Sequence, residues 1–283
     1  MRAGVEFIWN SAIEAVKTDE EGVTLTTKSG QVWTGDYVVA ADGARSTVRH
    51  AVGIEMEGTR SANNFIVVDV KEDPENPLPL ERVFHYHHPA VDGRNVLFVP
   101  FAGGWRVDLQ LFEGDDPDHY SGTEGVRKWL PKVMDEKYAD RVTWVSTYQF
   151  LQVVAKNFTD AHRRVFLVGE AAHLFAPFGA RGLNSGVPDA FSAAQAISAA
   201  IHAEDRETAG QVTMVAAEER RRAAQYNRDA AGIALEHLQG QSLGMSVKRQ
   251  VAASLASIWP QFGRWLDEGP YGPRSGPSEA TKY

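Results

Sequence analysis

The chain has 283 residues, of which 43% are hydrophobic and 23% are charged, and its formal net charge is −8. This composition is typical of a globular protein with a substantial core, and the negative charge argues against a nucleic-acid binder, which is usually basic. The absence of cysteine excludes disulfides, thiolate metal sites and cysteine nucleophiles, and it favours a cytoplasmic protein. No apolar run approaches the length of a membrane span.

The first part of the chain is predicted to contain short strands followed by an α/β unit. The runs VEFIW, AIEAVKTD and VTLTTK are rich in β-forming residues and are separated by turn signals, which predicts a small antiparallel meander. Residues 36–53 then contain a continuous apolar strand, YVVAA, a tight turn, DGARS, and a short helix capped by Ser46. A continuous strand, a glycine turn and a helix are the wiring of a doubly wound α/β fold.

The middle of the chain, from about residue 63 to 158, is predicted to form an antiparallel sheet with one helix. Its strands are predicted to be NFIVVDV, ERVFHYHH, NVLFVPF, GWRVDLQLF and RVTWVSTYQFLQVV, and its helix GTEGVRKWLPKVMDEKY. The HYHH run is predicted to place His85 and His87 on one strand face. Two histidines without a third ligand are weak evidence for a metal, and we predict no metal site.

A glycine-rich segment at residues 169–190, GEAAHLFAPFGARGLNSGVPDA, joins a short buried strand, RRVFLV, to an alanine-rich helix. A backbone this bare allows a ligand to approach the main chain. Because proline is tolerated only in the first turn of a helix, Pro188 predicts that this helix begins near Ser185 or Val187. Further helices are predicted to follow, and the Gly-, Pro- and Ser-rich residues 269–283 are predicted to form an extended tail.

Two of these stretches, VVAADGARSTVR and RRVFLVGEAAHLFAPFGARGLNSGVPDA, resemble the class A flavoprotein aromatic hydroxylases, which include phenol and para-hydroxybenzoate hydroxylases. The first resembles the Asp-Gly motif of that family, and the second resembles its Gly-Asp motif and the following loop. The order also matches over about residues 1–230, because a β-rich layer separates the motifs and helices follow. The resemblance implies an α/β fold: a partial doubly wound FAD-binding fold with an antiparallel β-rich substrate layer and C-terminal helices.

The resemblance also implies a division of labour along the chain. Residues 1–54 and 159–228 correspond to the FAD-binding part, residues 55–158 to the substrate-binding layer, and residues 229–283 to C-terminal helices and a flexible tail. The implied activity is hydroxylation of a small phenol-like aromatic substrate, with FAD as cofactor and NAD(P)H and O2 as co-substrates. No catalytic side chain is predicted, because the cofactor carries the chemistry and the protein positions it.

The cofactor-binding residues that the resemblance implies lie in the two motifs. They are Asp42, Gly43, Arg45, Gly169, Glu170, Pro177, Gly179, Gly182, Leu183 and Asn184. The residues themselves support this ligand, since glycines allow amide groups to approach ring oxygens, and a helix N-terminus stabilises negative charge on reduced flavin. We expect the ring to contact residues 179–184. The alternative is that the glycines only form a helix cap and close packing.

Glu170 departs from the family pattern, which has Asp at this position. The family's Asp binds the ribityl chain, and the glutamate side chain is one methylene longer. On the substrate side, Arg106 in GGWRVDLQL matches a Trp-Arg of the family and is predicted to face the substrate, or alternatively to pair with Asp108. His173 is predicted to be structural. Three aromatic residues are predicted to line an aromatic pocket or to pack in the core: Trp105, Phe175 and Phe178.

The family's opening strand, GxGxxG turn and helix, which bind the adenosine and pyrophosphate of FAD, have no counterpart in this sequence. A sheet without that strand exposes an edge and an apolar face, so a homo-oligomer or a complementing N-terminal half is expected as partner. Two alternative functions stay open. One is a truncated, catalytically silent remnant or one half of a split flavoprotein. The other is a different flavin reaction, such as epoxidation, halogenation or dehydrogenation.

Overall fold

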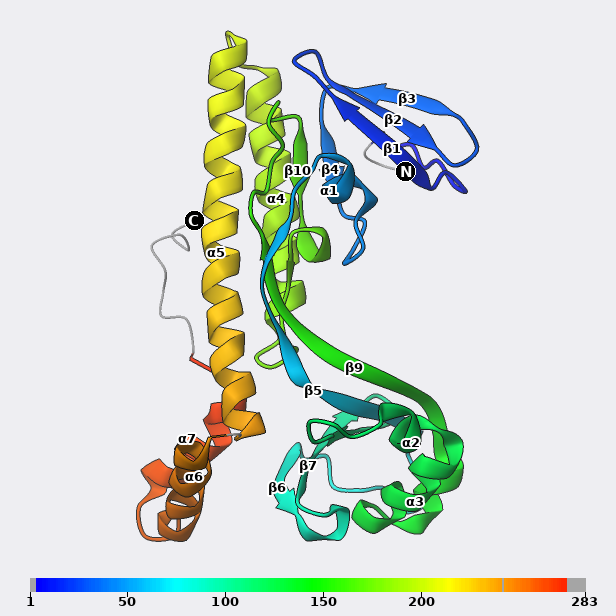
Figure 1. Ribbon diagram of the computed structural model, residues 1–283, viewed down its shortest axis with the longest axis vertical. Helices are drawn as coiled ribbons and strands as arrows, with labels where there is room; N and C mark the ends of the chain where they lie inside the picture. The colour runs from blue at the N-terminus through cyan, green and yellow to red at the C-terminus, as the bar shows by residue number, and fades with distance from the viewer. Residues whose placement is uncertain (1–3, 241, 274–283) are drawn as a thin grey trace. The chain divides into compact units, whose positions relative to one another are not determined.

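The computed structural model describes residues 4–240 and 242–273, which divide into two compact units (Figure 1). Unit 1 contains residues 4–59, 152–233 and 271–273, and unit 2 contains residues 60–151 and 234–270. The chain passes between the units within four elements: strand β5 (Met56–Lys71), strand β9 (Val142–Ala155), helix α5 (Arg206–Gln239) and the 3-10 helix Gly269–Tyr271.

Unit 1 contains an antiparallel meander, a parallel strand pair and a short helix. The meander has the order β1-β2-β3, formed by Ile13–Thr18, Val23–Thr27 and Val32–Gly35. The parallel pair consists of β4 (Val38–Ala40) and β10 (Val165–Leu167), followed by α1 (Thr47–Ala51) and by β11 (His173–Leu174), respectively. The Ser46 hydroxyl accepts a hydrogen bond from the Arg49 amide at 2.9 Å, so the structure has the predicted cap.

The first predicted strand, VEFIW, is wrong. The described residues 4–8 form no strand, and the large apolar side chains from Val5 to Trp9 are exposed. The meander takes its third strand from Val32–Gly35 instead, because the KSGQ turn closes a hairpin in which the Gly30 amide donates to the Thr27 carbonyl. A local turn therefore decides the pairing, and an apolar pattern alone does not.

Two long helices of unit 1, α4 (Arg181–Ile201) and α5, lie side by side (Figure 1). The helix α4 begins at Arg181, so the predicted start near Ser185 is wrong and Pro188 lies inside the helix. Proline there lacks the amide that would donate to the Asn184 carbonyl. The early start is stabilised by tertiary contact, because Ser185 is buried and its hydroxyl accepts a hydrogen bond from Asn227 of α5 at 3.0 Å.

Unit 2 is built on the strands β9-β5-β8-β7-β6 of a six-stranded antiparallel sheet, whose sixth strand, β11 of unit 1, pairs with the end of β9. Its remaining strands are β6 (Val83–His88), β7 (Arg94–Phe101) and β8 (Gly104–Gln110). The predicted middle helix, residues 122–138, appears as α3 (Thr123–Val133) and the start of the 3-10 helix Glu136–Arg141, and the short helix α2 (Pro117–Ser121) before it was not predicted. Alternate strand residues such as Val68 and Val107 pack against Leu130 of α3 in one hydrophobic core. The opposite sheet face carries Arg106 and Asp108.

The C-terminal helices of unit 2 are α6 (Leu243–Leu255) and α7 (Pro260–Glu268). Arg249 of α6 is buried and donates from Nη1 to the carbonyls of His237 and Leu238 at 3.2 and 3.3 Å. It therefore satisfies carbonyls at the C-terminus of α5 that have no partner within that helix. Four short 3-10 helices complete the described elements: Pro89–Val91, Glu136–Arg141, Gly169–Ala171 and Gly269–Tyr271.

Three further sequence expectations concern the C-terminal tail, the histidines of β6 and a membrane span. The predicted tail falls largely on residues 274–283, which lie outside the described residues. His85 and His87 do not share a strand face, because the register shifts between His85 and His88 and His87 has a positive φ of 53°. Among the helices that the structure describes, none combines the length and apolar character needed to cross a membrane.

Candidate functional site

The DGARS segment forms a tight turn between β4 and α1. Gly43 has a φ of 79°, a left-handed conformation that favours glycine. The Asp42 carboxylate accepts a hydrogen bond from the Val48 amide at 3.0 Å, which satisfies one donor in the first turn of α1. The side chains of Asp42 and Arg45 are exposed, so the turn presents one acidic and one basic group to solvent.

The Gly169–Ala171 turn follows β10 directly. Gly169 has a φ of 56°, and Glu170 is exposed. The turn lies against the helix α4, since a Cβ on Gly186 would lie only 3.3 Å from the Gly169 Cα. Gly169 suits the left-handed backbone conformation, and Gly186 allows helix and turn to approach closely without a displaced neighbour.

The structure brings these two turns together, although they are far apart in the sequence. Strands β4 and β10 are parallel neighbours, so their carboxyl ends lie at the same sheet edge, where ligands of open α/β sheets bind. Arg49 joins the turns directly. Its Nη2 donates to the Ala44 carbonyl at 3.0 Å, and its Nη1 donates to the Ala171 carbonyl at 2.9 Å.

The loop before α4 contains the remaining predicted cofactor residues. Pro177 and Gly179 are exposed, and the first helical turn exposes Gly182, Leu183 and Asn184. Ala180 at the N-cap provides no side-chain hydrogen bond within the described residues, so the first amides of this long helix are available to a ligand.

The two loop glycines differ in what surrounds them. A Cβ on Gly179 would lie 2.6 Å from the carbonyl oxygen of Tyr271, so at this position the chain itself requires glycine. A Cβ on Gly182 would meet no described atom within 4 Å. The open side of Gly182, next to exposed amides, fits the approach of a flat ring, and the backbone therefore suits a flavin.

A buried ionic network lies behind this surface, and the sequence analysis missed two of its members. Asp189 of α4 is 1% exposed, and its carboxylate lies 2.7 Å from His173 Nε2 and 2.8 Å from Arg220 Nε. The same carboxylate accepts the Gly169 amide at 3.2 Å. The sequence signal for Asp189 was that it is the one charged residue in the alanine-rich stretch VPDAFSAAQA. Arg220 lies in a run of charged residues, which gave no signal that this arginine has a buried partner.

The predicted substrate residue Arg106 is partly exposed on the open face of the unit 2 sheet. It forms an ion pair with Asp69 of the neighbouring strand at 2.8 Å and not with Asp108, the alternative considered from the sequence. Its guanidinium also lies 5.5 Å from the ring centroid of Trp144. Burial raises the pKa of the Asp108 carboxyl to about 7.

The three predicted pocket aromatics are not one cluster. Trp105 is buried in the core of unit 2, where its indole donates to Glu72 at 2.5 Å. Phe175 and Phe178 belong to unit 1, where the Phe175 ring stacks on His173 with a centroid distance of 4.6 Å and Phe178 is buried. Core packing, the alternative considered from the sequence, is the outcome for Trp105.

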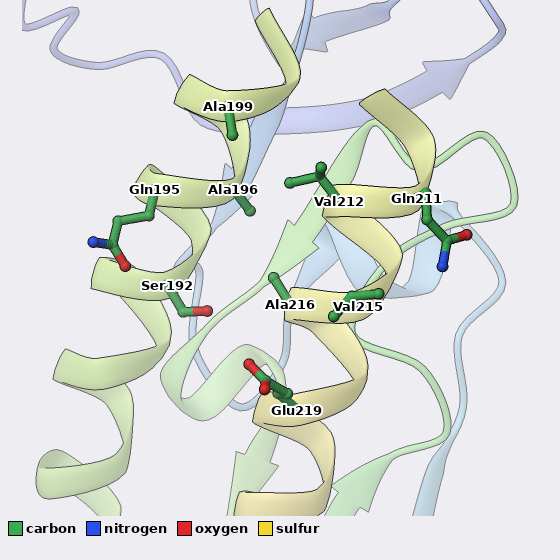
Figure 2. A pocket seen from close by; sticks show the side chains of 9 residues that line it. All are labelled: Ser192, Gln195, Ala196, Ala199, Gln211, Val212, Val215, Ala216 and Glu219. Atoms are coloured by element: carbon green, nitrogen blue, oxygen red, sulfur yellow. The ribbon is translucent and has the colours of Figure 1, made fainter. Parts of the chain in front are cut away.

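A groove of about 430 Å³ lies between α4 and α5, and Figure 2 shows the side chains that line it. Its lining consists of small, aliphatic and polar side chains with one carboxylate: Ser192, Gln195, Ala196, Ala199, Gln211, Val212, Val215, Ala216 and Glu219. None of the predicted cofactor residues lines it. A carboxylate without a cation also disfavours a phosphate-bearing ligand, so the candidate site is the surface of the two turns and the α4 loop.

The curated proteins similar to this chain include hydroxylases. A 3-(3-hydroxy-phenyl)propionate/3-hydroxycinnamic acid hydroxylase of Burkholderia cenocepacia (strain HI2424) is 32% identical over 197 residues, covering 67% of this chain and 33% of that protein. A tetracenomycin A2 monooxygenase-dioxygenase of Streptomyces glaucescens is 30% identical and covers 71% and 38%, respectively. The chain thus spans about a third of the length of the curated relatives it matches.

Solved structures show the same fold. A p-nitrophenol 4-monooxygenase from Pseudomonas putida DLL-E4 matches with a TM-score of 0.69 and 22% identity, covering 95% of this chain and 68% of that chain. An anhydrotetracycline hydroxylase from Streptomyces rimosus matches with a TM-score of 0.65 and 24% identity, covering 96% and 55%. Residues 1–230 match the family described as FAD binding domain. The resemblance seen in the two motifs is therefore confirmed, and the chain belongs to this family of FAD-binding proteins.

Proposed function

We propose that this chain forms the flavin- and substrate-binding parts of an FAD-dependent monooxygenase, which hydroxylates a phenol-like aromatic substrate with NAD(P)H and O2. The relatives named as hydroxylases and monooxygenases support this reaction class. The observation that carries the proposal is the pairing of the Asp-Gly turn with the Gly169–Ala171 turn beside the exposed N-terminus of α4.

The proposed cofactor residues lie in unit 1. The ribityl chain of FAD would be held by exposed polar groups and backbone of the two turns. The residues are Asp42, Gly43 and Arg45 on one turn and Gly169 and Glu170 on the other. The ring would lie on the α4 loop: Pro177, Gly179, Gly182, Leu183 and Asn184. FAD supplies the redox chemistry when bound. The amides of the first turn of α4 would stabilise negative charge on its reduced ring.

The proposed substrate layer is the open sheet face of unit 2. Arg106 is oriented there by Asp69 and lies near the Trp144 ring, so it offers a fixed hydrogen-bond donor beside an aromatic surface. Phe178 of unit 1 is proposed as a further substrate residue, although its ring is buried in this structure.

The partner is proposed to be a second copy of this chain or a complementing N-terminal half. The support is a stripe of apolar side chains on α4, spaced four residues apart: Leu183 is 81% exposed, Val187 64% and Phe191 61%. Val39 of β4 is also exposed. Apolar patches of this kind mark interaction surfaces. A cytoplasmic location is proposed because the sequence has no cysteine.

Gly182→Ala tests the cofactor site without disturbing the fold. Gly182 is the second residue of α4 with open space around it, so alanine should leave stability unchanged or raise it by up to about 1 kcal/mol. A flavin ring against this backbone would be displaced by the new methyl group. We expect FAD affinity, measured by quenching of flavin fluorescence, to fall about tenfold, or about 1.4 kcal/mol.

Gly244→Ala is the matched control. Gly244 is the second residue of α6 in unit 2, and a Cβ there would likewise meet no described atom within 4 Å. It should show the same small gain in stability and no change in FAD affinity. Equal FAD affinity in the wild type and in both variants would contradict the proposed placement of the ring.

A further inference from the structure

The Gly169–Ala171 turn is held at both ends by buried charged side chains from different helices. At its end, the Ala171 carbonyl accepts a hydrogen bond from Arg49 Nη1 at 2.9 Å. At its start, the Gly169 amide donates to the Asp189 carboxylate at 3.2 Å. Arg49 is 3% exposed and Asp189 1% exposed, so both groups lie inside unit 1 behind the turn.

Both charges occupy positions where an uncharged side chain would be less costly to bury. An isolated buried charge is unfavourable, and replacing buried ionic groups by apolar ones is often neutral or stabilising. Arg49 makes its strong hydrogen bonds to the carbonyls of Ala44 and Ala171, which are backbone groups of the two motif turns. Its charge is therefore used to fix the distance between these turns.

Asp189 fixes the turn to the helix that follows it. The carboxylate is itself oriented by Arg220 of α5 at 2.8 Å and by His173 at 2.7 Å. One helical turn earlier, Gly186 lies against Gly169, so α4 contacts the turn through backbone and through a charged side chain. The turn therefore has little freedom to move relative to the N-terminal half of α4.

We infer that Arg49 and Asp189 are positioning residues that set the Glu170 turn for flavin binding, an inference that rests on the proposed function. Glu170 lies between the two held backbone groups and is exposed. Neither Arg49 nor Asp189 needs to contact the flavin. Their effect on binding is exerted through the place in which the Glu170 side chain is held.

The experiment compares Arg49→Gln, Arg49→Lys and Asp189→Asn with a matched control, Asp160→Asn. Asp160 is also a buried carboxylate of unit 1 that accepts backbone amides, those of Arg164 and Val165 at 2.7 and 2.9 Å. It lies before β10, whereas the turn follows β10. Three quantities are measured: the melting temperature, amide hydrogen exchange of residues 169–171 without ligand, and FAD affinity.

We expect all four variants to lower the melting temperature. Only the Arg49 and Asp189 variants should accelerate amide exchange of residues 169–171 and weaken FAD binding. We expect FAD affinity to fall about tenfold or more when one charge-assisted hydrogen bond that holds the turn is lost. Arg49→Lys keeps the charge but not the fork of donors, so it should recover part of the affinity lost in Arg49→Gln. If Arg49→Gln fails to fold, Arg49→Lys takes its place as the test of Arg49.

A double-mutant cycle shows whether the effect passes through Glu170. In a Glu170→Ala background, Asp189→Asn should cost much less FAD affinity than it does when Glu170 is present. Equal costs in both backgrounds, or exchange and affinity that follow the Asp160→Asn control, would overturn the inference. If the wild-type chain bound no FAD, the proposed function would fail, and exchange of residues 169–171 alone would still decide whether the turn is held as inferred.

Discussion

Arg106 and Asp69 form a two-point ion pair across neighbouring strands, with Nε–Oδ1 and Nη2–Oδ2 distances both of 2.8 Å. The two residues stand directly opposite each other in the β5–β8 register, so the sheet itself presents the guanidinium and the carboxylate to each other. The pair fixes the orientation of Arg106 on the open sheet face. It also raises the pKa of the Arg106 guanidinium, mainly through the hydrogen bond to Asp69.

Breaking this pair should have little effect on stability. The Arg106 side chain is 45% exposed, and an ion pair with one solvated partner contributes at most about 1 kcal/mol. We expect Arg106→Gln and Asp69→Asn each to lower the free energy of unfolding in urea by less than about 1 kcal/mol, with unchanged FAD affinity. A loss of several kcal/mol would mean that Arg106 stabilises the sheet and would weaken its assignment to the substrate.

Asp108 should make unit 2 less stable as the pH rises. Its pKa is raised from 3.8 to about 7, chiefly by burial, so the folded state holds a proton in this range that the unfolded state has lost. The contribution of this group to the free energy of unfolding is fully present below pH 3.8 and is lost as the pH rises from 3.8 to about 7. The loss is at most about 1.4 kcal/mol per pH unit and up to about 4 kcal/mol in total.

Asp108→Asn should remove this dependence. Urea unfolding between pH 4 and 8 is the measurement, and the variant should gain stability relative to the wild type as the pH rises. Asp69→Asn, on the same sheet face, serves as the control and should leave most of the slope in place. A parallel pH dependence in the wild type and Asp108→Asn would show that the carboxyl is solvated and ionised throughout.

His237 should act in the opposite direction. Burial, with the positive charges of Arg249 and Lys248 nearby, lowers its pKa from 6.5 to about 4. The folded state keeps the ring neutral, so the stability it contributes is present above pH 6.5 and is lost as the pH falls towards 4, by up to about 3 kcal/mol. Glutamine cannot become charged and should abolish this loss.

The two groups therefore oppose each other between pH 4 and 6.5. The wild type should show a flatter profile than either single variant, because the gain from Asp108 on acidification offsets the loss from His237. His237→Gln should become more stable relative to the wild type as the pH falls, whereas Asp108→Asn should become less stable. Unfolding curves recorded at intervals of half a pH unit would separate the two contributions. If the stability of both variants followed the pH dependence of the wild type, both assignments would be excluded.

Local patterns were sufficient to predict most elements but not their contacts. The strands of unit 2 were recognisable because most are runs rich in apolar, aromatic and β-branched residues, and the cap at Ser46 is a local signal. The start of α4 was misplaced because its first turns depend on the buried hydrogen bond between Ser185 and Asn227. Such a tertiary contact outweighs the local preference against Pro188.

The candidate site shows the same limit more clearly. The glycines and the Asp-Gly motif could be read directly, since they reflect backbone conformation. The role of Asp189 could not, because its partners come from a preceding turn and from a separate helix. Likewise, Asp108 lies two residues from Arg106 in the sequence, whereas Asp69, the ion-pair partner of Arg106, is brought close only by the strand register.

Gly179→Ala should be harmful in a way that Gly182→Ala is not. Gly179 has a φ of 81°, and a Cβ would lie 2.6 Å from the Tyr271 carbonyl oxygen, so alanine adds both backbone strain and a clash. We expect a loss of stability of about 1–3 kcal/mol, seen as a lower melting temperature without any ligand. An unchanged melting temperature would indicate that the Tyr271 carbonyl does not lie against Gly179.

Glu170 occupies the position at which the resemblance to the aromatic hydroxylases implies an aspartate that binds the ribityl chain. Glu170 is exposed on a turn whose two ends are held by Arg49 and Asp189, so the turn cannot retreat to make room for the additional methylene. Glu170→Asp keeps the charge and shortens the reach. FAD affinity, measured by fluorescence quenching, should be equal or tighter in this variant, while Glu170→Gln, which keeps the length and removes the charge, should bind more weakly. The two variants separate reach from charge, because a carboxylate that accepts a hydrogen bond contributes about 1.5–3 kcal/mol, more than a neutral acceptor. A large loss of affinity in Glu170→Asp would show that the longer side chain has a partner on the cofactor that aspartate cannot reach.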